Sequence, residues 1–127
     1  MAGQTLNGRR VLVVEDESLV AMLIETALEE ENCIIRGPYA RLGEALDAAH
    51  TTDADAALLD VNLAGEHVFP VAEVLERRGI RFLLLSGYGD LALPPEKQHW
   101  PVCGKPFKMD ELVAALEKLV AGSTATP

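Results

Sequence analysis

Short runs of apolar residues alternate along this chain with longer segments in which apolar residues recur every three or four positions. The short runs lie at Arg10–Val14, Cys33–Ile35, Ala56–Leu59, Arg81–Leu85 and Val102–Cys103. Continuous apolar runs of this length, rich in β-branched residues, are typical of strands that are buried on both faces of a sheet. The pattern therefore predicts five short strands.

The intervening segments predict helices, because their apolar residues fall on one face of a helix. Such spacing occurs at Val20–Leu28, Leu42–Ala49, Val71–Leu75 and Met109–Val120. The stretch between the fourth and fifth strands is different, because a pair of prolines excludes a regular helix interior. We expect at most a short helix near Pro95–His99 in that stretch.

Strands that alternate with helices predict an α/β fold, in which a parallel sheet carries helices on both faces. Right-handed crossovers leave few arrangements, and for five strands the flavodoxin-like order 2-1-3-4-5 is expected. The second strand is expected to end at Gly37-Pro38. We expect a single domain over residues 1–127, with a core at about 9–121 and a short flexible tail at 122–127.

The composition predicts a soluble cytoplasmic protein. Hydrophobic residues make up 49% of the 127 residues, which is enough for a packed core. No apolar run approaches the roughly 20 residues that span a bilayer, and the polar start of the chain lacks the apolar stretch of a signal peptide. The formal net charge of −9 argues against nucleic acid as a partner, because phosphate groups would repel the chain.

Polar residues follow the predicted strands at the ends where folds of this kind bind ligands. Glu15 and Asp16 follow the first strand, Asp60 the third, Ser86 the fourth and Lys105 the fifth. Because the first and third strands are expected to be neighbours, their carboxylates meet in one pocket, where like charges raise one another's pKa or recruit a cation. A ligand set made only of oxygen atoms favours Mg²⁺ or Mn²⁺.

A divalent cation and a lysine beside an aspartate suit phosphoryl transfer, because they absorb charge on the phosphoryl oxygens while the carboxylate attacks. The product of this attack is an acyl phosphate, and Ser86 can donate a hydrogen bond to one of its oxygens. Each residue alone has an ordinary explanation as a loop acid, a helix cap, a turn or a surface lysine. Their order on successive strand ends favours the functional interpretation.

Four motifs carry a resemblance to the receiver domain of two-component response regulators. They are Val-Glu-Asp-Glu at 14–17, Leu-Leu-Asp-Val-Asn-Leu at 58–63, Leu-Leu-Ser-Gly at 84–87 and Lys-Pro-Phe at 105–107. The resemblance extends from about Val11 to Val120, and it is specific because the motifs fall in the right order. It implies a phosphoprotein of phosphorelay signal transduction in which Asp60 is the phosphoacceptor.

The resemblance also implies roles for the surrounding residues. Mg²⁺ would be bound directly by Asp16, Asp60 and the backbone carbonyl of Asn62, and through a water molecule by Glu15. Lys105 would pair with the phosphoryl group, and the Lys105-Pro106 peptide bond is expected to be cis. Ser86 would be the switch hydroxyl.

The implied phosphodonor is a sensor histidine kinase or a histidine phosphotransfer protein, and the implied output is a changed contact with a downstream protein. Such a chain is not an enzyme, apart from catalysing its own phosphorylation and dephosphorylation. The chain is either a stand-alone receiver or a fragment of a longer protein, and Met1 and the short tail favour the first of these. The sequence Ser-Gly-Tyr at 86–88 also resembles a subgroup of short, often stand-alone receivers.

The sequence departs from the family pattern at several positions. Val102 stands where receivers usually carry an aromatic residue in the fifth strand, Ala64 replaces a common proline, and Gly87 replaces a common alanine. Because Val102 has no ring that can rotate, we expect the loop from Gly87 to Pro95 to carry the conformational change. Tyr88 is either a substitute aromatic residue or an ordinary loop residue.

Two other functions remain open at this point. A Mg²⁺-dependent phosphohydrolase with an aspartate nucleophile usually has a second acid two residues after the nucleophile, where this chain has Asn62. A pseudo-receiver would bind partners without phosphorylation, but the complete set of acids, hydroxyl and lysine argues against it.

Overall fold

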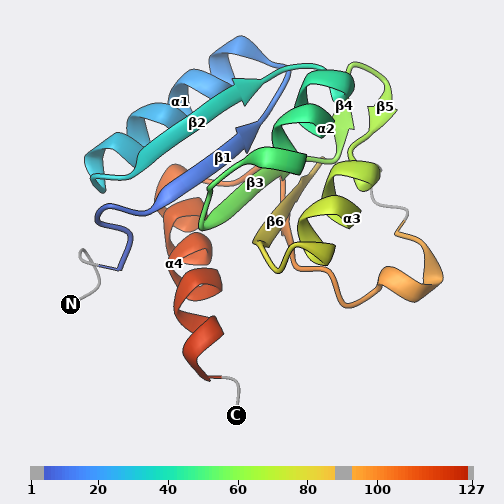
Figure 1. The fold of residues 1–127 in the computed structure, drawn as a ribbon. Coiled ribbons are helices and arrows are strands. Elements are labelled where there is room, and N and C mark those ends of the chain that lie inside the picture. The colour runs from blue at the N-terminus through green and yellow to red at the C-terminus, as the bar shows by residue number, and fades with distance from the viewer. Residues whose placement is uncertain (1–4, 88–92, 126–127) are drawn as a thin grey trace.

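The computed structural model describes residues 5–87 and 93–125, which form a parallel sheet with helices on both faces (Figure 1). The strands of this sheet are β1 (Arg10–Val14), β2 (Ile34–Tyr39), β3 (Ala56–Asp60), β6 (Arg81–Ser86) and β7 (Val102–Gly104). The helices are α1 (Ser18–Glu30), α2 (Leu42–Thr51), α3 (Phe69–Arg77) and α4 (Met109–Ala125), with a short 3₁₀ helix η2 (Pro95–Lys97) between β6 and β7. The predicted α/β fold class is confirmed.

The order of the strands confirms the expected flavodoxin-like arrangement. It is β2-β1-β3-β6-β7, which is 2-1-3-4-5 along the chain. All neighbouring strands in this sheet are parallel, and Asp60 lies opposite Leu85 while Ser86 lies opposite Gly104. This register brings Asp60, Ser86 and the residue after Gly104 to one edge of the sheet.

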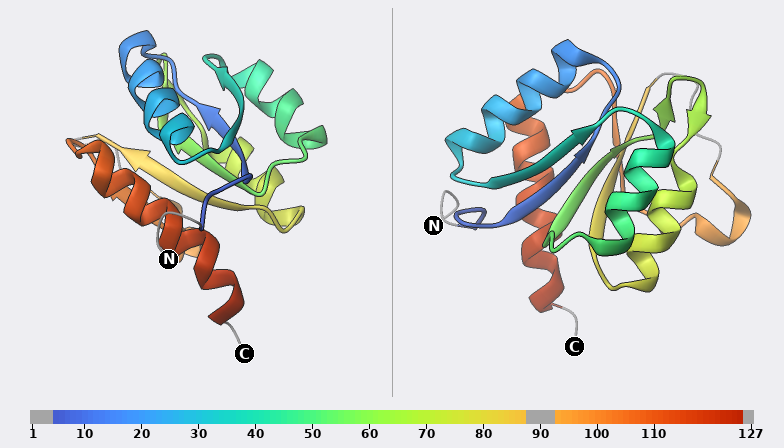
Figure 2. Two further views of the ribbon diagram at one scale, coloured as in Figure 1. Left: turned by 90° about the vertical axis from the view of Figure 1, so that its left-hand side faces the viewer. Right: turned by 45° about the horizontal axis from the view of Figure 1, so that its top comes forward.

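Alternate residues of the central strands face two separate cores. On one face of the sheet, Leu12 and Leu84 pack with residues of α2 and α3. On the other face, Val13 and Leu85 pack with residues of α1 and α4. Figure 2 shows the two pairs of helices on opposite sides of the sheet. These strand residues are buried, as continuous apolar runs predict.

The prediction that the second strand ends at Gly37-Pro38 is wrong, because β2 continues to Tyr39. Gly37 has a φ of 103°, and an added Cβ would lie 2.7 Å from the Val13 carbonyl oxygen. Pro38 is tolerated because β2 is an edge strand, where a missing N–H costs no ladder hydrogen bond. The extension matters for the site, since the Glu15 N–H donates to the Tyr39 carbonyl at 3.0 Å.

Helical and buried residues extend beyond the expected core of residues 9–121 at both ends. Helix α4 continues to Ala125, although a flexible tail was expected from residue 122. No proline lies between Met109 and Pro127, and Gly122 alone weakens a helix only slightly. At the other end, Leu6 is fully buried beside the α1 and α4 core.

A small hairpin after β3 is a feature that the sequence analysis missed. It consists of β4 (Asn62–Leu63) and β5 (Glu66–His67), which pair antiparallel. Ala64 and Gly65 have φ values of 50° and 91°, and two positive φ values in succession are typical of a type I′ hairpin turn.

Among the described residues, no helix is both long and apolar enough to cross a membrane.

Candidate functional site

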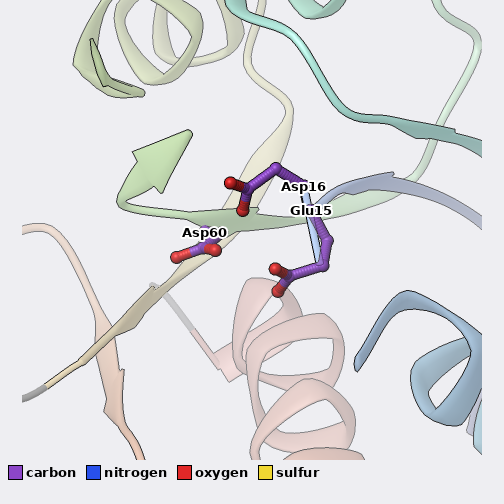
Figure 3. Close-up of side chains that lie close together, drawn as sticks. All are labelled: Glu15, Asp16 and Asp60. Atoms are coloured by element: carbon purple, nitrogen blue, oxygen red, sulfur yellow. The ribbon is translucent and has the colours of Figure 1, made fainter. Parts of the chain in front are cut away.

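The carboxyl ends of β1 and β3 bring three acidic side chains together (Figure 3). Glu15 and Asp16 directly follow β1, and Asp60 is the last residue of β3. One carboxylate oxygen from each of the three residues lies within 4.8 Å of the other two. This cluster follows from the pairing of β1 with β3 at the centre of the sheet.

Lys105 supplies a positive charge to this cluster. Its Nζ lies 3.3 Å from Asp60 Oδ1 and 3.7 Å from Glu15 Oε1. The Lys105 N–H donates to the Ser86 carbonyl at 2.7 Å, which positions the start of the side chain at the end of β7. The Lys105-Pro106 peptide bond is cis, as the resemblance implied. One lysine cannot neutralise three carboxylates, so the cluster keeps an excess of negative charge.

Burial changes the protonation of these groups. Glu15 and Asp60 are only 1% and 3% exposed. Burial, followed by the neighbouring Asp60, raises the pKa of Glu15 to about 8. Burial also raises the pKa of Asp60, although Glu15, Lys105 and the Asn62 backbone N–H act to lower it. For Lys105, burial lowers the pKa, but attraction to Asp60 and Glu15 outweighs it and the pKa is raised.

The oxygen atoms of the cluster fit a hard divalent cation. Glu15 Oε1 is buried and accepts no hydrogen bond within the described part of the chain. Such an oxygen is costly unless a cation or a proton lies close to it. Carboxylate oxygens are the ligands that Mg²⁺ prefers, and a cavity of about 290 Å³ opens beside Asp16, Asp60, Asn62 and Lys105.

Backbone N–H groups orient two of the carboxylates, and the sequence analysis did not identify them. The Glu17 N–H donates to Glu15 Oε2 at 3.1 Å, and the Ala64 N–H donates to Asp16 Oδ2 at 2.9 Å. The Ala64 donor belongs to the turn between β4 and β5. Gly65 was the one visible signal of that turn in the sequence.

Asn62 and Ser86 lie beside the carboxylates. The Asn62 side-chain Oδ1 accepts a hydrogen bond from the Gly65 N–H at 2.8 Å. Asn62, which stands where a phosphohydrolase would carry its second acid, therefore stabilises the hairpin turn. Ser86 is buried, and its Oγ donates to the Gly87 carbonyl at 3.2 Å. Tyr88, the candidate substitute aromatic residue, lies outside the described residues.

An exposed apolar surface beside the carboxylate cluster was also missed. Leu19, Met22 and Leu23 on α1 are 66%, 57% and 46% exposed, although the spacing grouped Leu23 with the core positions. Next to them, a groove of about 420 Å³ is lined by Val20, Leu23, Lys105, Phe107 and Met109, among others. Exposed apolar surface of this kind marks contact sites for other proteins.

The geometry agrees with a match to the family of the response regulator receiver domain, which covers residues 11–117. The chain belongs to this family. It is 34% identical over 119 residues to the transcriptional regulatory protein TcrA of Mycobacterium tuberculosis, a match that covers 90% of this chain and 47% of TcrA. The chain therefore spans about half the length of the curated relatives that it matches.

Solved receiver structures have the same fold. The solution structure of SdrG from Sphingomonas melonis Fr1 has a TM-score of 0.76 at 38% identity, and the match covers 91% of this chain and 98% of SdrG. The response regulator PhyR from Brucella abortus has a TM-score of 0.77 at 24% identity, with 98% of this chain and 53% of PhyR covered. At that identity, PhyR supports the fold alone. The chain is thus a receiver domain of the kind found in response regulators.

Proposed function

We propose that this receiver accepts a phosphoryl group on Asp60 from a phosphohistidine of a sensor kinase or phosphotransfer protein in the cytoplasm. The phosphorylated form then changes its contact with a downstream protein. The observation that carries this proposal is the position of Asp60. It is buried at the end of β3, with Lys105 Nζ at 3.3 Å and two further carboxylates beside it.

In the proposed reaction, an Asp60 carboxylate oxygen attacks the phosphorus of the donor. The O–P bond forms as the P–N bond breaks, and the imidazole leaves with the electron pair and takes up a proton. Only the ionised carboxylate attacks, and Lys105 favours that form against the effect of burial. A divalent cation held by Asp16, Asp60 and the Asn62 carbonyl, and through water by Glu15, would neutralise charge on the phosphoryl oxygens. Beyond this self-modification, we propose no enzymatic activity.

The proposed output starts at Ser86. Its hydroxyl makes a neutral hydrogen bond to the Gly87 carbonyl, whereas a phosphoryl oxygen on Asp60 would offer a charged acceptor, which binds about twice as strongly. The hydroxyl would therefore turn toward the phosphoryl group and release the Gly87 carbonyl. Because Val102 has no ring that can follow this movement, the change would be read in the chain that follows Ser86.

The exposed side of α1 is where we place the phosphodonor. Leu23 lines the groove that also contains Lys105, and Leu19 and Met22 are exposed on the same helix, so a protein bound there would bring its histidine close to Asp60. Burial of these side chains would drive the association, since apolar area removed from water contributes about 25 cal/mol per Å².

A small phosphodonor such as acetyl phosphate tests the acceptor without any kinase. In the presence of Mg²⁺, the wild-type chain should gain one phosphoryl group, seen as a mass increase of the intact protein. Asp60→Asn should fold normally and gain none, because the amide is not a nucleophile. Asp110→Asn, on the exposed start of α4, is the matched control and should be labelled like wild type. Undiminished labelling of Asp60→Asn would refute the proposal.

A further inference from the structure

One carboxylate on α3 holds three side chains from the connection between β6 and β7. Glu76 Oε1 accepts a hydrogen bond from Lys97 Nζ at 2.9 Å. Glu76 Oε2 lies 2.9 Å from His99 Nε2 and accepts from Trp100 Nε1 at 3.0 Å. The hydrogen bonds from Lys97, His99 and Trp100 lower the pKa of Glu76 to about 2, so it is ionised at neutral pH.

Burial of Trp100 strengthens this attachment. An exposed ion pair alone contributes little to stability, but Trp100 is 4% exposed and belongs to the core beneath α3. Its ring lies 5.5 Å from that of Phe82 in β6 and 6.0 Å from that of Phe69 at the start of α3. Aromatic pairs at these distances add about 0.5–1.5 kcal/mol beyond the buried area.

The same segment also contains local hydrogen bonds between its own backbone groups. The Lys97 N–H donates to the Pro94 carbonyl at 2.8 Å, and the Trp100 N–H donates to the Lys97 carbonyl at 3.1 Å. Residues 94–100 therefore form a compact unit that is attached to α3 from one side and leads directly into β7. The connection that starts at Ser86 has its second end fixed at this unit.

We propose that Glu76 is a positioning residue that keeps residues 94–100 on α3 when Asp60 is phosphorylated. This inference rests on the proposed function, because it concerns how far the change that begins at Ser86 can travel. It also concerns the missing aromatic residue at position 102. Trp100 is the aromatic residue that most closely precedes β7 in the sequence. Its indole N–H donates a hydrogen bond to Glu76, so the Trp100 ring cannot rotate in place of the aromatic residue that position 102 lacks.

Hydrogen exchange of the full chain with Mg²⁺, with and without beryllofluoride as a phosphoryl mimic, tests this role. In the wild type, the amides of Lys97 and Trp100 should exchange at the same rate in both states. In Glu76→Ala, the same amides should exchange at least about tenfold faster, because the variant loses all three hydrogen bonds to the carboxylate and the loss of one charge-assisted hydrogen bond alone predicts about tenfold. They should also become sensitive to beryllofluoride. Glu76→Gln, which keeps the shape of the side chain, should give a smaller effect in the same direction.

Fluorescence of Trp100 gives a second readout of the same attachment. Trp100 is the sole tryptophan of the chain, so quenching of its fluorescence by acrylamide should increase in Glu76→Ala and stay unchanged in the control Glu96→Gln, an exposed acid of the same segment. A purely structural Glu76 would lower stability without creating the response to beryllofluoride.

The possible failures of the two proposals are distinguishable. If beryllofluoride changes the exchange of the Val61 amide, next to Asp60, but residues 97 and 100 of the wild type also respond, then Glu76 is not the anchor. The same conclusion follows if the Val61 amide responds and Glu76→Ala leaves residues 97 and 100 insensitive. If no amide of the wild type responds at all, the proposed phosphorylation of Asp60 fails, and this inference fails with it.

Discussion

The charge state of Glu15 depends on what shares its buried site. Its Oε1 accepts no hydrogen bond among the described residues, and the single ammonium group nearby, that of Lys105, lies 3.7 Å away and is closer to Asp60. Burial therefore raises the pKa of Glu15 to about 8, and at neutral pH a proton takes the place that a cation would otherwise fill. Metal binding and proton release should be coupled at this residue.

The stability of the metal-free protein should consequently decrease as the pH rises. Because the pKa of Glu15 is raised from 4.5 to about 8, its contribution to folding is fully present below pH 4.5 and is lost by about pH 8. Between pH 5.5 and 8.5 the free energy of unfolding should fall by something on the order of a few kcal/mol. Urea titrations in EDTA, followed by tryptophan fluorescence, measure this change.

Variants and metal separate Glu15 from other carboxyl groups. Asp53 and Glu76, with pKa values lowered to about 2, titrate below this pH range and do not contribute to the slope. Glu15→Gln should remove most of the slope, whereas Glu25→Gln on α1 should not. Mg²⁺ should also reduce the slope, because a cation stabilises the ionised carboxylates. An equal slope for Glu15→Gln and wild type would contradict the assignment.

Among the elements, those with a continuous apolar run were predictable and those shaped by a backbone turn were not. Strands β1, β3 and β6 lie where the sequence analysis predicted them. Strands that are buried on both faces consist of nearly continuous apolar residues, and such short runs stand out in the sequence. The end of β2 was predicted too early because Gly37-Pro38 is typical of a turn. Only the position of β2 at the edge of the sheet, which the sequence pattern does not give, allows a proline within this strand. The β4–β5 hairpin was missed because Ala64 adopts a positive φ, and alanine is not a residue type from which a positive φ is expected.

Gly37 offers a prediction about the element that supports Glu15. Gly37→Ala should destabilise the protein by about 1–3 kcal/mol, because alanine is strained at a φ of 103° and its Cβ would contact the Val13 carbonyl. Gly43→Ala is the matched control, since this glycine lies in α2 and has open space around it. It should stabilise the protein by about 0.5 kcal/mol. Equal effects of the two substitutions in urea titrations would contradict this account of β2.

If the phosphodonor protein binds the exposed face of α1, substitutions there should slow phosphorylation by a kinase but not by a small phosphodonor. Leu23→Gln should slow phosphorylation by a cognate kinase about tenfold, because a buried leucine contributes roughly 1.5–3 kcal/mol to a contact. Labelling by acetyl phosphate should be unchanged. Ile34→Thr removes an exposed apolar side chain on β2, away from the groove, and should behave like wild type with both donors. A kinase that phosphorylates Leu23→Gln at the wild-type rate would exclude this surface.

In the whole molecule, the site residues were predictable because a parallel sheet collects strand ends at one edge. Asp60 and Lys105 are 45 positions apart in sequence, yet β3 and β7 end at the same edge with only β6 between them, and the lysine side chain spans that distance. Contacts that depend on side-chain direction were not predictable in this way. The hydrogen bond from Ala64 to Asp16 and the attachment of Trp100 to Glu76 each involve a connecting segment whose path the apolar pattern does not describe.

The central claim is that Asp60 carries the phosphoryl group, and chemical trapping of the acyl phosphate tests it most directly. Borohydride reduces an aspartyl phosphate to homoserine, which peptide mass spectrometry locates in the sequence. After incubation with acetyl phosphate and Mg²⁺, we predict homoserine at position 60 and at no other aspartate, and none when EDTA replaces Mg²⁺. Homoserine at Asp16 or elsewhere, or a phosphorylated protein with Asp60 unchanged, would contradict the account.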